Sequence, residues 1–316
     1  MVSRKAGRTA YAPLERIRGD SLGRFSKGFS APVAAPVSMR YSPPPPHLGD
    51  RISSLYEMRQ DIADYDELER ADRPQFRILL SGIGYLEFAD GHRDPSARVL
   101  LLGPTSGPLR GVGSGPLWCV GAGLLPPAWV SLVGKDADRL IDRAIDVETL
   151  IGDAAPKLHA DMLASDSTDA RFALLCDLLD TVTRPSDPAQ LAFTQLVDAW
   201  LIDRSDPEVE DLVALSGLSM RQLERMAKRY YGLPPKTLAR KYRALRAAAA
   251  LARGEDLDAN GLSDAFYDQS HLIREVKRFA GLTPQQIRAQ ESHLLTSISE
   301  GRKSLYGRVG PLVSDA

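Results

Sequence analysis

Two stretches of the sequence carry basic side chains at spacings that suit contact with a polyanion. SMRQLERMAKRYYGLPP occupies 219–235 and DQSHLIREVKRFAGLTP occupies 268–284, so the second begins 49 residues after the first. Aligned in this way, the two share Leu, Arg, Lys, Arg, Gly, Leu and Pro at matching positions. Lysine and arginine neutralise phosphates, and arginine also binds guanine through two hydrogen bonds. The repeated pattern predicts nucleic-acid recognition by two similar helices.

The positive charge of the chain is local. The formal net charge is −1 over 316 residues, yet 219–253 holds 10 Lys and Arg residues against the single acid Glu224. A basic segment in an otherwise balanced or acidic protein is typical of a nucleic-acid contact surface.

The element that positions the first basic stretch is a helix preceded by a tight turn. Asp206-Pro207 predicts the start of a short helix, and Ser216-Gly217 predicts the turn that ends it. Ser219 and Gln222 then form a capping box, which fixes the start of the second helix. Helix, glycine-containing turn and basic second helix make a helix-turn-helix, whose second helix enters the major groove of DNA.

The second basic stretch has the same construction. Asp268 is placed to cap its helix, and Gly281 suits the left-handed position after it. Between the copies, 236–253 is 18 residues long and rich in strong helix formers. Such a helix is about 27 Å long, close to the roughly 34 Å that separates adjacent major-groove faces. The repeat therefore predicts two reading helices in adjacent grooves.

At these residues the sequence resembles the DNA-binding domain of the AraC/XylS family of transcription regulators. FYDQSHLIREVKRFAGLTPQQIR is similar to the C-terminal signature of that family, and SMRQLERMAKRYYGLPPK to its first reading helix. The resemblance implies these base-reading positions: Arg221, Glu224, Arg225, Ser270, His271 and Arg274. The neighbouring basic side chains are expected to bind phosphates: Lys228, Arg229, Lys236, Lys277 and Arg278.

One part of the pattern departs from the family. Where the second unit usually begins Ile-Ala-x-x-x-Gly-Phe, this chain has Asn260-Gly261 and Ala265-Phe266. A glycine inside a helix costs about 1 kcal/mol relative to alanine. The departure leaves open whether the second unit reads bases or only clamps phosphates.

The rest of the chain predicts an α+β protein in four parts. Residues 1–46 form a basic, proline-rich disordered tail, and 47–204 form a sensor or regulatory domain of short strands followed by helices. Residues 205–291 form an all-α domain with two helix-turn-helix units, and 292–316 form a flexible tail. The second part also resembles the sensor-type domain of some AraC/XylS members, which implies no particular ligand.

Other chemistries find little support in the sequence. The two cysteines, Cys119 and Cys176, make neither a disulfide framework nor a metal site, and no cofactor is predicted. The glycines of GVGSGPLWCVGAG lack the lysine of a phosphate-binding loop. The uncharged run 111–134 is interrupted by glycine and proline, which argues against a membrane span. An alternative is a DNA-anchored enzyme with its active centre in the N-terminal domain, which would require an activated cysteine. A third is a pure interaction protein with helical pairs, which would not bind DNA.

The combined prediction is a cytoplasmic, non-enzymatic, sequence-specific regulator of transcription that binds double-stranded DNA. A small-molecule effector, RNA polymerase and a second copy of the chain are further candidate partners. The sequence does not distinguish activation from repression.

Overall fold

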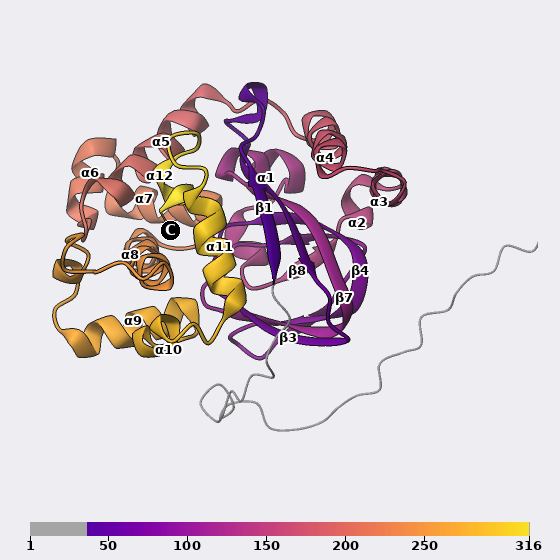
Figure 1. Cartoon of the computed structure of the whole chain (residues 1–316). Helices are drawn as coiled ribbons and strands as arrows, with labels where there is room; N and C mark the ends of the chain where they lie inside the picture. The colour runs from indigo at the N-terminus through magenta and orange to yellow at the C-terminus, as the bar shows by residue number, and fades with distance from the viewer. Residues whose placement is uncertain (1–36, 316) are drawn as a thin grey trace, which may run out of the picture. The chain divides into compact units, whose positions relative to one another are not determined.

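The computed structural model describes residues 37–315, and its N-terminal part is one antiparallel sheet (Figure 1). The strands run in the order β1-β2-β7-β4-β6-β8, with β3 paired to β7 and β5 paired to β4. Their bounds are β1 (Ser38–Ser42), β2 (Ile52–Gln60), β3 (Asp64–Glu69), β4 (Gln75–Glu87), β5 (Arg93–Pro95), β6 (Val99–Leu102), β7 (Leu109–Leu124) and β8 (Ala144–Asp146). The predicted β-rich region is confirmed, and the glycine-rich run lies in and around β7 rather than in a nucleotide loop.

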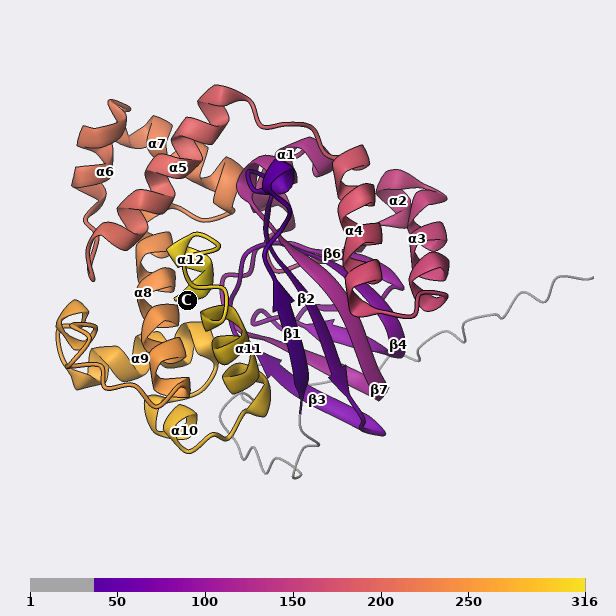
Figure 2. The ribbon, with the colours of Figure 1, turned by 45° about the horizontal axis from the view of Figure 1, so that its top comes forward.

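The two faces of the sheet bury different cores. Because successive side chains of a strand point to opposite faces, Leu55 of β2 and Val120 of β7 belong to one core, while their neighbours Tyr56 and Cys119 belong to another. The first core is closed by helices α1 (Pro126–Val133), α2 (Glu148–Ile151), α3 (Ala154–Leu163) and α4 (Thr168–Val182). Figure 2 shows α2–α4 on one side of the sheet and α11 on the other.

The C-terminal half is helical, as predicted for an α+β chain. Its elements are α5 (Pro188–Asp203), α6 (Val209–Ser216), α7 (Met220–Tyr231), α8 (Pro235–Ala252), α9 (Gln269–Ala280) and α10 (Pro284–Arg288). Phe193, Val197 and Trp200 of α5 share one hydrophobic core with α6, α7 and α8. The core of the helix-turn-helix region thus extends across the boundary expected at 204/205.

The prediction of a flexible tail at 292–316 is wrong for the residues described. The segment forms α11 (His293–Lys303) and α12 (Pro311–Ser314). Leu294 and Ile298 of α11 are buried against the second face of the sheet, with Tyr56 and Cys119. The apolar residues of α11 were too few to reveal this packing, because their partners lie more than 170 residues away in sequence.

Two further expectations need correction. The tail predicted for 1–46 ends earlier, because Ser38–Ser42 is the edge strand β1, paired with β2; the expectation for 1–36 lies outside the described residues. The helix expected to begin after Asp206 begins at Val209, without a side-chain cap. The Asp206 carboxylate instead pairs with the buried guanidinium of Arg243.

Candidate nucleic-acid interface

The first helix-turn-helix consists of α6 and α7, and local signals determine its geometry. Gly217 ends α6 at φ 64°, a left-handed conformation that glycine adopts without strain. Ser219 N donates to Gln222 Oε1 at 3.0 Å, and Gln222 N donates to Ser219 Oγ at 3.4 Å. The capping box predicted from the sequence is therefore confirmed, and it sets the first residue of α7.

Helix α7 divides into a buried and an exposed face. Leu223, Ala227 and Tyr230 are buried in the helical core. The three predicted base-reading residues of this helix, Arg221, Glu224 and Arg225, are exposed in its first two turns, and Lys228 and Arg229 are exposed one turn later. The face available to DNA therefore carries four cationic side chains and one carboxylate.

The second unit has a well-formed reading helix but no first α-helix. The 3₁₀ turn Ser263–Ala265 (η4) stands where that helix was expected. Gly261 lies at φ 62°, which ends any helix there. The departure from the family pattern thus changes the backbone. Asp268 nevertheless caps α9 by accepting from His271 N at 2.6 Å.

Helix α9 presents its predicted residues less uniformly than α7. Ser270 and Arg274 are exposed, as are the predicted phosphate ligands Lys277 and Arg278. His271 is half-buried: its ring meets Phe266 edge to face at 5.8 Å, and its Nδ1 accepts from Tyr267 N at 3.3 Å. When Nδ1 accepts, the neutral ring carries its proton on Nε2. In that form Nε2–H of His271 is a hydrogen-bond donor.

Helix α8 lies between the two reading helices, and several of its basic side chains are buried or paired within the protein. Arg240 Nε and Nη2 donate to the two carboxylate oxygens of Glu275 in α9, at 2.8 and 2.7 Å. Lys241 and Arg243 are buried. The local excess of basic residues in the sequence therefore overstated the DNA-facing charge. Lys236, the predicted phosphate ligand at the start of α8, is exposed.

Both reading helices line one groove of about 630 Å³. Glu224 and Met220 come from α7, His271 from α9, and Lys236 and Arg240 from α8. The tertiary structure thus brings one predicted residue of each reading helix to a shared groove. Arg221, Arg225, Ser270 and Arg274 are not among the residues that line it.

Two exposed apolar residues flank the reading helices and were missed from the sequence. Tyr267, directly before the cap of α9, is 94% exposed, and Met220 at the start of α7 is 41% exposed. Both side chains therefore add exposed apolar surface beside the two reading helices. An aromatic residue next to the Asp268 cap was the available sequence signal.

The β-rich region contacts both reading helices. Asp136 directly precedes the 3₁₀ turn Ala137–Leu140 (η3), and its Oδ1 lies 3.6 Å from Nε of Arg229 in α7. Ala71 N, between β3 and β4, donates to Phe279 O near the end of α9 at 2.7 Å. Because the last carbonyls of a helix lack partners within it, this hydrogen bond satisfies a group that would otherwise need water.

A buried polar cluster joins the sheet to α8 and α11. Lys241 Nζ donates to Asp72 O at 2.6 Å and to Thr105 O at 2.8 Å. The Asp72 carboxylate pairs with Arg302 of α11. Burial acts to raise the pKa of Asp72, but Arg302 and Arg70 outweigh it and hold that pKa well below its usual range. Burial lowers the pKa of Lys241 to about 7.

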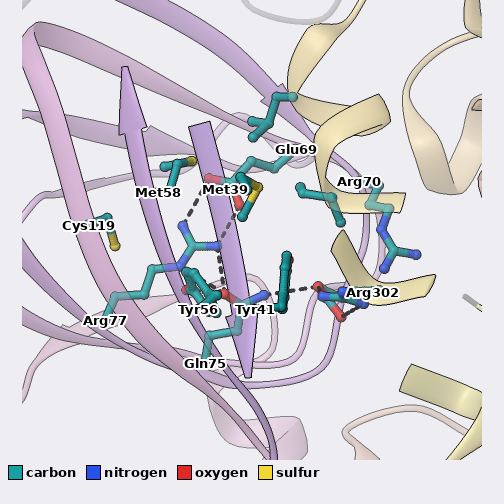
Figure 3. A pocket seen from close by; sticks show the side chains of 13 residues that line it. Met39, Tyr41, Tyr56, Met58, Glu69, Arg70, Gln75, Arg77, Cys119 and Arg302 are labelled. Atoms are coloured by element: carbon teal, nitrogen blue, oxygen red, sulfur yellow. Dashed lines mark hydrogen bonds and ion pairs between the residues drawn. The ribbon is translucent and has the colours of Figure 1, made fainter. Parts of the chain in front are cut away.

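The interior between the sheet and α11 is filled by its own side chains. A cavity of about 30 Å³ lies there, and Figure 3 shows side chains that line it, among them Tyr41, Tyr56, Gln75 and Arg302. Tyr56 Oη donates to Gln75 Oε1 at 2.6 Å. A space of this size holds about one water molecule, so it does not admit an organic ligand in this conformation.

Neither cysteine is set up as a nucleophile. Both are buried, and burial raises the pKa of the Cys119 thiol to about 12 and that of Cys176 to about 11. A reactive cysteine needs the thiolate, so the requirement of the enzyme alternative is not met. Within 37–315, no group of His, Cys, Asp and Glu is arranged to hold a metal ion. No helix of that range combines the length and apolar character needed to cross a bilayer.

Comparison with known proteins agrees with the predicted resemblance. A family described as "Helix-turn-helix domain" matches residues 212–290, and no curated protein matches the sequence. Similar solved structures include ToxT from Vibrio cholerae, with 9% identity and a TM-score of 0.44, covering 81% of this chain and 98% of that one. Another is the AraC-like transcriptional activator CuxR, with 14% identity and a TM-score of 0.29, covering 71% and 91%.

Likeness at that distance carries no conclusion about ligand or mechanism. The matched domain and the two capped basic helices support a conclusion about the kind of protein. Residues 212–290 match a helix-turn-helix domain and hold both capped basic helices, which supports a DNA-binding regulator of transcription.

Proposed function

We propose that α7 and α9 bind adjacent major grooves on one side of a DNA duplex, and that the β-rich region controls this binding in response to a small molecule. The observation that carries the proposal is the pair of capped helices, each with an exposed basic face, at the two sides of an 18-residue helix. A helix of 18 residues spans about 27 Å. This length suits two reading helices about one turn of DNA apart.

Each predicted residue has a role in this arrangement. Arg221, Glu224 and Arg225 on α7 and Ser270, His271 and Arg274 on α9 contact base edges, whereas the neighbouring lysines and arginines neutralise phosphates. The second unit lacks its first α-helix, but the Asp268 cap and the Arg240–Glu275 ion pair hold α9 in position. We therefore expect α9 to read bases as well as bind phosphates.

The protein acts without catalysis in this proposal. An effector that binds one arrangement of the chain more tightly than another shifts the population towards it, by the difference in binding free energy. The contacts of Asp136 with Arg229 and of Ala71 with Phe279 give the β-rich region direct access to both reading helices. We place the protein in the cytoplasm, where DNA is met; RNA polymerase and a second copy of the chain are further proposed partners.

The test is selection of binding sites from a random duplex library with the full chain. The wild type is expected to enrich two sequence blocks centred about 10 bp apart. Arg225→Ala should blur one block and Arg274→Ala the other, because each bidentate contact with a base contributes about 1–3 kcal/mol of discrimination. Lys157→Ala, which removes an exposed cation on α3, is the matched control and should leave both blocks sharp.

Two results would contradict parts of the proposal. If Arg274→Ala leaves the selected sequence unchanged, α9 binds phosphates without reading bases. If the wild type enriches no sequence, and adding cell extract as a source of effectors does not change that, the sequence-specific reading is wrong.

A further inference from the structure

A large cavity lies outside the sheet interior, where α5, the amino end of α1 and the segment 307–313 meet. Its volume is about 890 Å³, within the range of roughly 300–1,000 Å³ that is usual for small-molecule sites. Most of its wall is apolar, with Leu125, Leu191, Ile202 and Leu312 among the lining residues. Prolines at 44, 46, 126, 127 and 311 stiffen the wall.

Two opposite charges face this cavity without pairing with each other. Arg73 is 8% exposed, and its one hydrogen bond through the guanidinium runs from Nη2 to Leu312 O at 3.2 Å. Asp198 accepts from Tyr231 Oη at 2.8 Å. Neither side chain takes part in an ion pair anywhere in 37–315.

Burial acts to lower the pKa of Arg73, but the nearby Tyr242, Asp198 and Asp72 outweigh it and raise that pKa, so the guanidinium stays charged beside the cavity. Burial also raises the pKa of Asp198, and Arg73 and the Tyr231 hydroxyl only partly offset this effect. A molecule carrying both a carboxylate and an ammonium group would pair with both residues at once, since guanidinium groups bind carboxylates through paired hydrogen bonds.

We propose that this cavity binds a zwitterion of the amino-acid type, either a free amino acid or a dipeptide, with the carboxylate on Arg73, the ammonium on Asp198 and apolar side chains against the walls. Of the other charged groups in the lining, Asp50 is already engaged by Arg51 and by Ser186 N, and Arg308 is exposed.

The site is connected to the DNA-binding surface through one residue. Tyr231 is the last residue of α7, and its hydroxyl donates to Thr194 O at 2.9 Å as well as to Asp198. An ammonium group on Asp198 therefore acts on a carboxylate that already holds the end of the first reading helix. Because the zwitterion would be the effector of the regulator, this inference rests on the proposed function.

Isothermal titration calorimetry with the full chain tests the inference. The probes are leucine, phenylalanine and leucyl-leucine, compared with isocaproate, which lacks the ammonium, and leucinamide, which lacks the carboxylate. At least one zwitterion is expected to bind. Each analogue that lacks one charge should bind about ten- to a hundredfold more weakly, because a hydrogen bond to a charged group contributes about 1.5–3 kcal/mol.

Variants locate the binding in the molecule. Arg73→Met and Asp198→Asn should each weaken the zwitterion by a similar factor; the asparagine keeps an oxygen that can accept from Tyr231. Ala199→Trp fills the cavity from α5 while leaving both charges in place, and should abolish binding. Ala192→Trp, an exposed position on the same helix that does not line the cavity, should have no effect.

Three outcomes would overturn the inference: no zwitterion binds at millimolar concentration, isocaproate or leucinamide binds as tightly as leucine, or Ala199→Trp leaves binding unchanged. Measuring DNA binding of the same preparations separates this inference from the proposed function. A preparation that selects a DNA sequence but binds no zwitterion refutes only the cavity assignment. One that binds leucine but selects no sequence refutes only the reading of DNA.

Discussion

Replacing Lys241 by methionine should change how the stability of the protein depends on pH. Lys241 is 2% exposed and donates to the backbone oxygens of Asp72 and Thr105, which ties α8 to the β-rich region. Burial lowers its pKa from 10.5 to about 7. Between these two values the unfolded chain binds a proton that the folded chain does not, so the free energy of unfolding rises with pH across this window.

The size of the effect follows from the shift in pKa. One pKa unit corresponds to about 1.4 kcal/mol, so the full window corresponds to roughly 5 kcal/mol. Between pH 7.5 and 9.5 the stability of the wild type should therefore gain about 3 kcal/mol over that of Lys241→Met, which cannot titrate. The methionine variant also leaves Thr105 O without this donor, which costs a further ~1–3 kcal/mol at every pH, whereas Asp72 O still accepts from Thr105 N.

The assay is urea denaturation of both proteins at several pH values, followed by the fluorescence of the buried Trp129 and Trp200. Lys228→Met, which removes an exposed lysine from α7, is the matched control; its difference from the wild type should not vary with pH over this range. If the difference between the wild type and Lys241→Met is constant or shrinks as the pH rises, the folded protein holds Lys241 charged and the reasoning is wrong.

Two other predictions concern the domain contact and the DNA surface. Gly217 and Gly281 both end helices at positive φ, at 64° and 82°. A Cβ added to Gly281 would lie 2.6 Å from Leu68 Cδ2, whereas a Cβ added to Gly217 would meet nothing within 4 Å. Both alanine variants should lose about 1–2 kcal/mol of unfolding free energy from backbone strain. Gly281→Ala should lose about 1–3 kcal/mol more from overpacking against Leu68. Equal losses of unfolding free energy for the two variants, measured by urea denaturation, would refute the contact with Leu68. Affinity for the selected duplex should fall linearly on a logarithmic salt scale, and Lys277→Ala should reduce that slope by about 1. An unchanged slope, measured by fluorescence anisotropy, would remove Lys277 from the phosphate ligands.

The reading helices could be predicted because their signals are local. A capping box acts between residues three apart, as with Ser219 and Gln222. A left-handed glycine ends a helix wherever tertiary contacts do not override it, as at Gly281. The amphipathic pattern of α7 likewise depends only on the helical period. These features need no knowledge of the rest of the fold, and the structure has them where the sequence predicts.

The sequence-based predictions were wrong where a charged side chain could serve either a local role or a contact with a distant residue. Asp206 had the residue type of a helix cap, but its carboxylate pairs with Arg243, which is 37 positions away in sequence. Lys241 belongs to the basic segment by sequence and to the domain contact by structure. Charge type is visible in a sequence, whereas the partner that uses the charge depends on how distant elements pack.

The sequence by itself thus determined two capped, basic helices and the spacer between them, since periodicity and caps operate within a few residues. Only the tertiary structure decided the path of the C-terminal segment and the position of the cavity. Arg73 follows a strand of the sheet and Asp198 lies in α5, and their charges face a common space only because α5 packs with the helix-turn-helix core. Contacts between residues so far apart are set by the burial of apolar surface across the whole fold, which no local pattern encodes.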